Sequence, residues 1–142
     1  MDIRQITDGF AVSPQITPED VPRLAEAGFV RVICNRPDSE VDEAHASAAI
    51  SAACAAHGLE FRLIPVDHSG LSRELVAAQG EAVDGAGGPV FAYCRSGTRS
   101  CHVWALGRAG RMDTDEIMAA GARGGYDLSP LRPSIEAMAE RS

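Results

Sequence analysis

The sequence of 142 residues contains no lysine and no long apolar segment. Its 13 basic residues are all arginine and stand against 20 acidic residues, so the formal net charge is −7. Nucleic acid is not an expected partner, because a polyanion would be repelled and no run of basic residues offsets the repulsion. Nothing approaches the roughly 18 to 20 consecutive apolar residues that span a bilayer, so no membrane partner is expected.

Targeting and metal-binding signals are also lacking. The first five residues show no basic flank followed by an apolar run, which predicts a chain that is not exported. The four cysteines form no Cys-x-x-Cys pair and are too sparse for a disulfide scaffold, so we expect free thiols in a reducing cytoplasm. The four histidines show no His-x-x-x-His spacing, and neither a metal ion nor another cofactor is expected.

What is present is an alternation of strand and helix patterns. It predicts an α/β fold with a mostly parallel central sheet flanked by helices on both faces, in a single domain over residues 1–142. In such sheets, ligands bind beyond the carboxyl ends of the strands. We expect one or two short strands within 3–12 and further strands at 30–34, 60–66 and 89–93. Helices are expected at 18–27, 42–57, 75–83, 100–109, 114–120 and 129–140.

The segment 89–100 carries the strongest chemical signal. A buried apolar strand ends at Cys94, a short polar loop follows, and Arg99 opens a helix. Backbone N–H groups of a tight loop and of a helix N-terminus bind anions and stabilise a thiolate, so Cys94 is predicted to be a nucleophile. Gly97 allows a left-handed turn, and Arg99 can hold two oxygens of a tetrahedral anion. Ser100 could donate a hydrogen bond to the sulfur.

The remaining loop positions complete the predicted anion site. Their backbone amides would surround the substrate, which adds Arg95, Ser96 and Thr98 to Gly97 as binding residues. The alternative is a buried, inert thiol followed by an ordinary turn. Two arginines in a glycine-containing loop between a strand and a helix fit that alternative poorly.

The segment Tyr93-Cys94-Arg95-Ser96-Gly97-Thr98-Arg99-Ser100 resembles the active-site loops of the tyrosine and dual-specificity cysteine phosphatases and of the rhodanese sulfurtransferases. The wider chain resembles the bacterial family named for the phosphatase-like domain of beta-lactamase-hydrolase-like proteins, and this implies a dual-specificity-phosphatase-like fold. The matching segments are Gln15 to Asp20, Ala27 to Phe29, Asn35 to Asp38, Ile64 to Val66, the Cys94 loop and Gly125 to Leu128.

Loop length departs from the phosphatase pattern. Those phosphatases have five residues between the cysteine and the arginine, whereas four separate Cys94 from Arg99 here. That length, with the string Cys-Arg-Ser-Gly, is closer to rhodaneses, whose loop holds a persulfide.

The resemblance also implies a general acid on a separate loop, and Asp67, 27 positions before Cys94, is the candidate. A polar turn residue is the alternative. His68 could orient that acid or be a surface group, and Arg36 could contact the anion or pair with Asp38 or Glu40. Cys34 is either a resolving thiol or a buried strand residue.

Three hypotheses follow. The first is a phosphatase that hydrolyses phosphate monoesters on a small anionic substrate or a phosphoprotein through a phosphocysteine at Cys94. The second is a sulfurtransferase that takes sulfane sulfur from a donor such as thiosulfate. The third is a regulatory module that binds an oxyanion without turnover.

Overall fold

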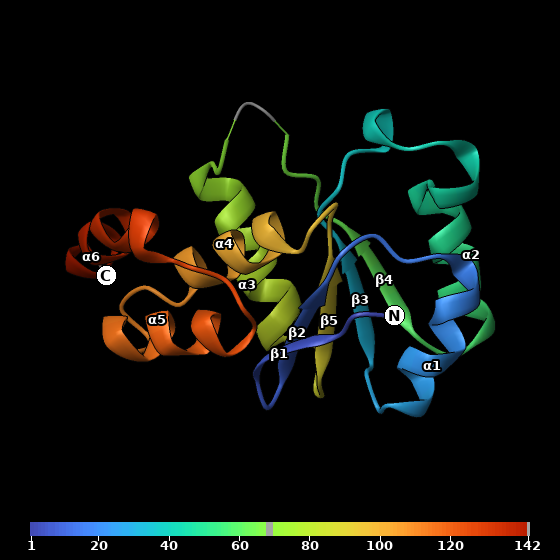
Figure 1. The fold of residues 1–142 in the computed structure, drawn as a ribbon, viewed down its shortest axis with the longest axis horizontal. Helices are drawn as coiled ribbons and strands as arrows, with labels where there is room; N and C mark the ends of the chain where they lie inside the picture. Colours follow the sequence, from blue (N-terminus) through green and yellow to red (C-terminus); the bar gives the residue numbers. More distant parts are fainter. Residues whose placement is uncertain (68–69, 142) are drawn as a thin grey trace.

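A five-stranded sheet forms the centre of the computed structural model, which describes residues 1–67 and 70–141 (Figure 1). The strand order is β1-β2-β5-β3-β4, and only the β1–β2 pair is antiparallel. This confirms the predicted mostly parallel sheet. The strands are β1 (Arg4–Thr7), β2 (Phe10–Ser13), β3 (Arg31–Cys34), β4 (Glu60–Leu63) and β5 (Val90–Tyr93).

Helices cover both faces of the sheet (Figure 1). One layer consists of α1 (Val21–Glu26) and α2 (Ser47–Ala56), and the other of α3 (Arg73–Asp84), α4 (Thr98–Gly107), α5 (Thr114–Arg123) and α6 (Arg132–Glu140). Each layer encloses its own group of buried apolar side chains. The strands β2, β3 and β5 are buried along their whole length, as expected for parallel strands covered on both faces.

The prediction of a continuous helix over residues 42–57 is wrong for its first turn. Glu43–His45 forms a separate short 3-10 helix, Ala46 is extended with ψ 153°, and α2 begins only at Ser47. Alanine favours a helix, but Asp42 and Asp38 cap two different helices here. The Asp42 carboxylate accepts the His45 N–H, and the Asp38 carboxylate accepts the Ser47 N–H at 2.7 Å.

Other boundaries shift by a few residues. The strand expected over 60–66 pairs as a strand only over Glu60–Leu63, although the Ile64 and Val66 amides still donate to the carbonyls of Cys34 and Asn35. Helix α4 begins two residues earlier than expected, at Thr98. Helix α5 continues to Arg123, three residues beyond the expected end at 120, and includes Gly121.

The carboxyl ends of the four parallel strands lie in register. Tyr93 pairs with Ser13 on one side and with Cys34 on the other, and Cys34 pairs with Leu63. The loops that follow these strands therefore meet at one edge of the sheet, at the top of Figure 1. None of the helices in the described ranges has both the length and the apolar character to cross a bilayer.

Candidate functional site

Cys94 follows directly after the buried strand β5. Its own side chain is fully buried, and its N–H donates to the Ser13 carbonyl at 3.4 Å, which extends the pairing of β2 and β5 by one residue. The two neighbouring strands thus fix the backbone from which the sulfur projects. Beyond this point the chain turns into the loop that leads to α4.

Gly97 makes that turn possible. It has φ 89° and stands at the N-cap of α4, a conformation that residues with a Cβ rarely adopt. A Cβ here would also overlap the hydroxyl of Tyr126. The Gly97 N–H donates to the Cys94 Sγ at 3.1 Å, so one loop amide is directed at the sulfur as the sequence predicted.

The Thr98 amide has a different partner. It donates to the Ser96 Oγ at 3.3 Å, while the Ser96 hydroxyl donates to the Thr98 Oγ1 at 2.9 Å. These two contacts tie the outer side of the loop to the first turn of α4. Several loop amides were predicted to point inward. Among the described contacts, the Gly97 amide is the one that donates to the sulfur.

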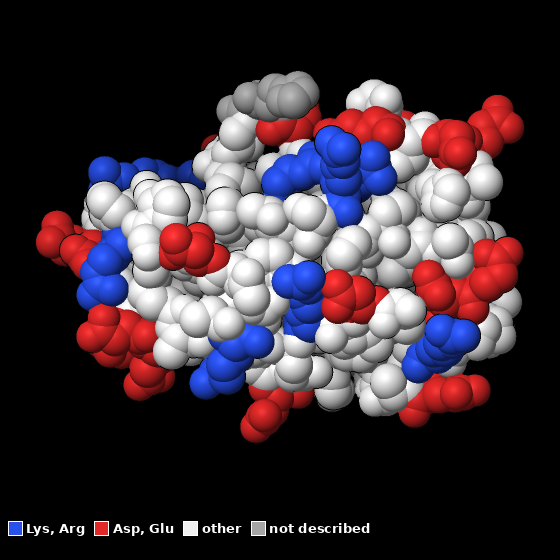
Figure 2. All heavy atoms as spheres, in the orientation of Figure 1, with Lys and Arg blue, Asp and Glu red and all other residues white. Residues whose placement is uncertain are grey.

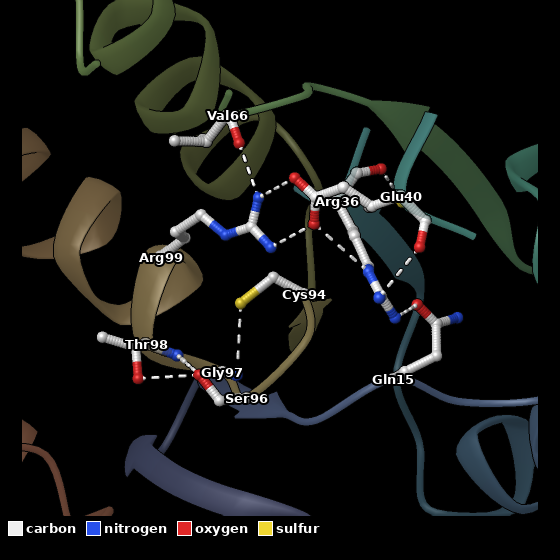
Figure 3. Close-up of polar contacts among 10 residues, drawn as sticks. Gln15, Arg36, Glu40, Val66, Cys94, Ser96, Gly97, Thr98 and Arg99 are labelled. Atoms are coloured by element: carbon white, nitrogen blue, oxygen red, sulfur yellow. Dashed lines mark hydrogen bonds and ion pairs between the residues drawn. The ribbon is translucent and has the colours of Figure 1, made fainter. Parts of the chain in front are cut away.

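Arg99 presents its guanidinium beside the sulfur (Figure 3). Its Nη1 donates to the Glu40 carboxylate at 2.9 Å and to the Val66 carbonyl at 2.8 Å, and its Nη2 donates to Glu40 at 2.7 Å. These bonds use three of the five donors of the group. These hydrogen bonds, all between described residues, leave out the Nε–H and the second Nη2–H, which form a parallel pair suited to two oxygens of an anion.

Glu40 connects Arg99 to a second arginine (Figure 3). Its carboxylate also accepts from the Arg36 Nε at 3.4 Å, and its carbonyl accepts from the Arg36 Nη2 at 3.1 Å. The hydrogen bonds from Arg99 are the main cause that lowers the pKa of Glu40, and Arg36 adds to the effect. In turn, the Glu40 hydrogen bonds raise the pKa of Arg99, with a further contribution from Cys94. Arg99 therefore stays cationic.

A cavity of about 410 Å³ opens at this edge and is lined by Arg36, Glu40, Asp67, Arg95 and Arg99. Figure 2 shows arginine side chains gathered at the top centre of the molecule, with acidic side chains beside them. The structure thus brings the predicted acid, Asp67, into the same cavity as Arg99. Arg95 is exposed, and its carbonyl accepts the Gln15 N–H at 3.3 Å. His68 lies outside the described residues.

Ser100 lies one residue beyond Arg99, on the buried side of α4. Its Oγ is buried and finds no hydrogen-bond partner within the described part of the chain. A buried hydroxyl without a partner is costly, which makes Ser100 an available donor close to the loop. The predicted hydrogen bond from the Ser100 hydroxyl to the Cys94 sulfur is not among the described contacts.

The other three cysteines are buried, free thiols. Burial raises the pKa of Cys34, that of Cys54 to about 11 and that of Cys101 to about 12. Cys34 packs with Tyr93 in the layer of α1 and α2, and its sulfur contacts the Arg36 carbonyl at 3.3 Å. Among the residues that the structure describes, no group of three or more His, Cys, Asp or Glu side chains could hold a metal ion.

Two residues of the site were not predicted from the sequence: Glu40, which contacts Arg99, and Tyr126, which contacts the Cys94 loop. Glu40 was considered only as a partner of Arg36, although its position just after β3 places it at the same sheet edge as Arg99. Tyr126 appeared only within the matching segment 125–128, and its hydroxyl donates to the Ser96 carbonyl at 3.0 Å. The likeness of that segment to a known family was the one available signal, because 30 residues separate the two partners.

Comparison with known proteins gives one matching family model, described as "Beta-lactamase hydrolase-like protein, phosphatase-like domain", over residues 2–111. Proteins named beta-lactamase hydrolase-like protein from Xylella fastidiosa (strain Temecula1) and Agrobacterium fabrum (strain C58) are 32% and 31% identical over 130 and 126 residues. These alignments cover 90% and 87% of this chain but only 30% and 29% of the relatives. The chain thus spans less than a third of their length.

Solved structures show the same fold. A candidate phosphatase from Neisseria meningitidis Z2491 is 31% identical to this chain and has a TM-score of 0.83. The alignment covers 97% of this chain and 99% of the Neisseria chain. The active form of a protein named Tk-PTP has a TM-score of 0.77 at 17% identity, and the alignment covers 99% of this chain and 98% of Tk-PTP. At that identity the likeness concerns the fold, which is that of the cysteine phosphatases.

Proposed function

Because the chain belongs to the family of the beta-lactamase hydrolase-like protein, phosphatase-like domain, we propose that it is a cysteine-dependent phosphatase that hydrolyses phosphate monoesters. The observation that carries the proposal is the shared position of three groups. The Gly97 N–H lies 3.1 Å from the Cys94 sulfur, the Arg99 guanidinium lies beside that sulfur (Figure 3), and Arg99 also lines the cavity. A nucleophile and donors for anionic oxygens are what phosphoryl transfer to sulfur requires.

In the first step, the Cys94 thiolate attacks phosphorus and the bond to the leaving oxygen breaks. The Arg99 donor pair and the Gly97 amide hold phosphoryl oxygens, and Arg95, Ser96 and Thr98 surround them. Asp67 gives its proton to the leaving oxygen, which departs as an alcohol or phenol. The products of this step are a phosphocysteine and an Asp67 carboxylate.

In the second step, water attacks the phosphorus of the phosphocysteine. The Asp67 carboxylate takes a proton from this water, and the sulfur–phosphorus bond breaks. Phosphate leaves and the Cys94 thiolate returns, with the Ser100 hydroxyl donating a hydrogen bond to the departing sulfur. No metal or other cofactor takes part in the proposed steps.

The cavity supports a compact anionic substrate. Its lining carries three arginines against two acids, one of which, Glu40, is already paired with Arg99 and Arg36. The resulting positive character suits a phosphate monoester, on a small molecule or on a phosphoprotein. Arg95 is exposed at the rim and offers a contact to the part of the substrate beyond the phosphate.

Hydrolysis of a small aryl phosphate tests the proposal. The wild type is expected to turn over, Cys94→Ser to lose turnover, and Asp67→Asn to slow poor leaving groups more than good ones. Cys54→Ser is the matched control, since Cys54 lies in α2, away from the cavity. Equal rates for wild type and Cys94→Ser would rule the assignment out. Saturable phosphate binding without turnover would instead point to the oxyanion-binding module.

The short loop favours sulfur transfer as a second candidate. Four residues separate Cys94 from Arg99, and Gly97 supplies the described amide contact to the sulfur. In this reaction the Cys94 thiolate attacks the sulfane sulfur of thiosulfate, the sulfur–sulfur bond breaks, and sulfite leaves. A second thiolate then takes the sulfane sulfur and releases Cys94. A mass increase of one sulfur on Cys94 after thiosulfate treatment, without phosphatase activity, would support this candidate.

A further inference from the structure

Tyr126 contacts the backbone of the Cys94 loop from outside the segment that the family model matches. It lies between α5 and α6, at the end of a turn in which its own N–H donates to the Gly121 carbonyl at 2.9 Å. Only 8% of its surface is exposed. Its hydroxyl donates to the Ser96 carbonyl at 3.0 Å.

The Ser96 carbonyl and the Gly97 N–H belong to the same peptide group. A trans peptide is planar, and its C=O and N–H point in opposite directions. The carbonyl points to Tyr126, and the N–H points to the Cys94 Sγ at 3.1 Å. One peptide group therefore joins the tyrosine hydroxyl on one side to the cysteine sulfur on the other.

Several contacts hold Tyr126 in this position. The Arg4 guanidinium lies over its ring, 5.3 Å from the centroid, and Arg4 also donates to the Gly124 carbonyl at 3.1 Å. Gly97 and Gly124 both lack the Cβ that would overlap the hydroxyl or crowd the ring. Burial raises the pKa of Tyr126 to about 12, so the hydroxyl keeps its proton and remains a donor at neutral pH.

We infer that Tyr126 is a positioning residue that fixes the Ser96–Gly97 peptide with its N–H directed at the sulfur and strengthens that donor. A hydrogen bond to the carbonyl polarises the peptide group and makes its N–H a better donor. If the peptide turned over, its carbonyl would face the thiolate and the anionic substrate and repel both. Tyr126 opposes this rotation because the turned peptide loses the hydroxyl bond.

The inference rests on the proposed nucleophilic role of Cys94, but it holds for phosphoryl and sulfur transfer alike. Its test is therefore the reactivity of the sulfur and not turnover alone. The variant Tyr126→Phe removes one oxygen atom and keeps the ring against Arg4. The measurement is the rate at which iodoacetamide alkylates Cys94, followed by peptide mass spectrometry between pH 5 and pH 10.

In Tyr126→Phe, the alkylation profile is expected to move to higher pH, with a loss of roughly five- to tenfold in rate on its acidic side. The two proteins should reach similar rates in alkaline solution, where the thiolate forms in both. A tyrosine that only supported the fold would not produce this convergence. Turnover of the aryl phosphate, if present, should fall mainly in kcat because the Gly97 donor serves the reacting group.

Tyr93→Phe is the matched control, since Tyr93 is the only other tyrosine of the chain and packs in the opposite layer. Its profile is expected to coincide with that of the wild type. The Gly97 amide proton gives an independent measurement in an NMR spectrum, where it should move upfield in Tyr126→Phe as its bond to sulfur weakens.

An unchanged profile together with an unchanged Gly97 amide signal would overturn the inference. If Tyr126→Phe is less stable, the two measurements are made at a temperature where thermal unfolding shows it folded. A shifted profile in a protein without phosphatase activity would support the inference and reject the proposed phosphatase. An unshifted profile in an active phosphatase would do the reverse.

Discussion

Glu40 orients Arg99 through both of its oxygens. The pair is only about one quarter exposed, and the two bonds of 2.9 and 2.7 Å occupy the end of the guanidinium that faces away from the open donor pair. A bidentate carboxylate restricts the rotation of the arginine more than a single contact does. Arg99 is therefore set in the orientation that an anion needs before any substrate arrives.

Replacing Glu40 with glutamine is expected to lower kcat/KM for an aryl phosphate by about tenfold, which corresponds to about 1.4 kcal/mol. The amide keeps the size of the side chain but supplies one acceptor in place of two and no charge. Glu43→Gln makes the same change at an exposed position nearby and should leave kcat/KM unaltered. A glutamine variant as active as the wild type would show that Arg99 needs no such support.

Asp38 has an effect on a whole element, because it caps α2 from nine positions upstream. The Ser47 N–H and hydroxyl both donate to its carboxylate at 2.7 Å. Ala46, the residue that precedes α2, has no side-chain donor or acceptor of its own, so the cap has to come from elsewhere. This contact also holds the 35–46 loop, which carries Arg36 and Glu40, against the start of α2.

Asp38→Ala is expected to destabilise the protein by about 1 kcal/mol at neutral pH, measured by urea unfolding. The hydrogen bonds from Ser47 lower the pKa of Asp38 in the folded state. Its contribution is therefore fully present above the unfolded-state pKa and is lost as the pH falls through the lowered folded value.

The stability difference between wild type and Asp38→Ala should accordingly disappear in acid. Ser39→Ala, an exposed neighbour, serves as the control and should show a small difference that does not vary with pH. A difference for Asp38→Ala that persists at the lowest pH would argue against the cap.

The long-range cap explains why the sequence predicted the elements better than their ends. Strand and helix patterns are local, so the parallel strands and the six α-helices could be expected from composition and turn residues. The start of α2 depends on Asp38, and the Cys94 loop depends on Tyr126, both through contacts between distant positions. The roles of Cys94, Gly97 and Arg99 could be predicted because these residues are close together in the sequence. The contact between Glu40 and Arg99 could not, because it depends on β3 and β5 ending side by side.

On the scale of the whole molecule, residues 113–141 complete the core that supports the site. Ile117, Leu128 and Ile135 are almost fully buried in the same layer as Trp104 of α4, and Tyr126 reaches the loop from this part of the chain. Trp104 in turn stacks on Phe10 of β2, with 5.7 Å between the ring centroids. This packing joins the C-terminal helices to α4 and β2, and that residues 1–142 form one domain stays a prediction.

Ile135→Ala tests that prediction, because it removes a fully buried side chain of α6 far from the loop. The expected cost is about 2–4 kcal/mol, and it should lower the unfolding midpoint seen by far-UV circular dichroism and by Trp104 fluorescence equally. The tryptophan is the only one in the chain, so its signal reports on α4. Ser134→Ala, exposed on the same helix, should leave both midpoints unchanged. If the dichroism alone shifted, α6 would unfold separately and the loop would not depend on it. A common shift means that the Cys94 loop unfolds together with the C-terminal helices.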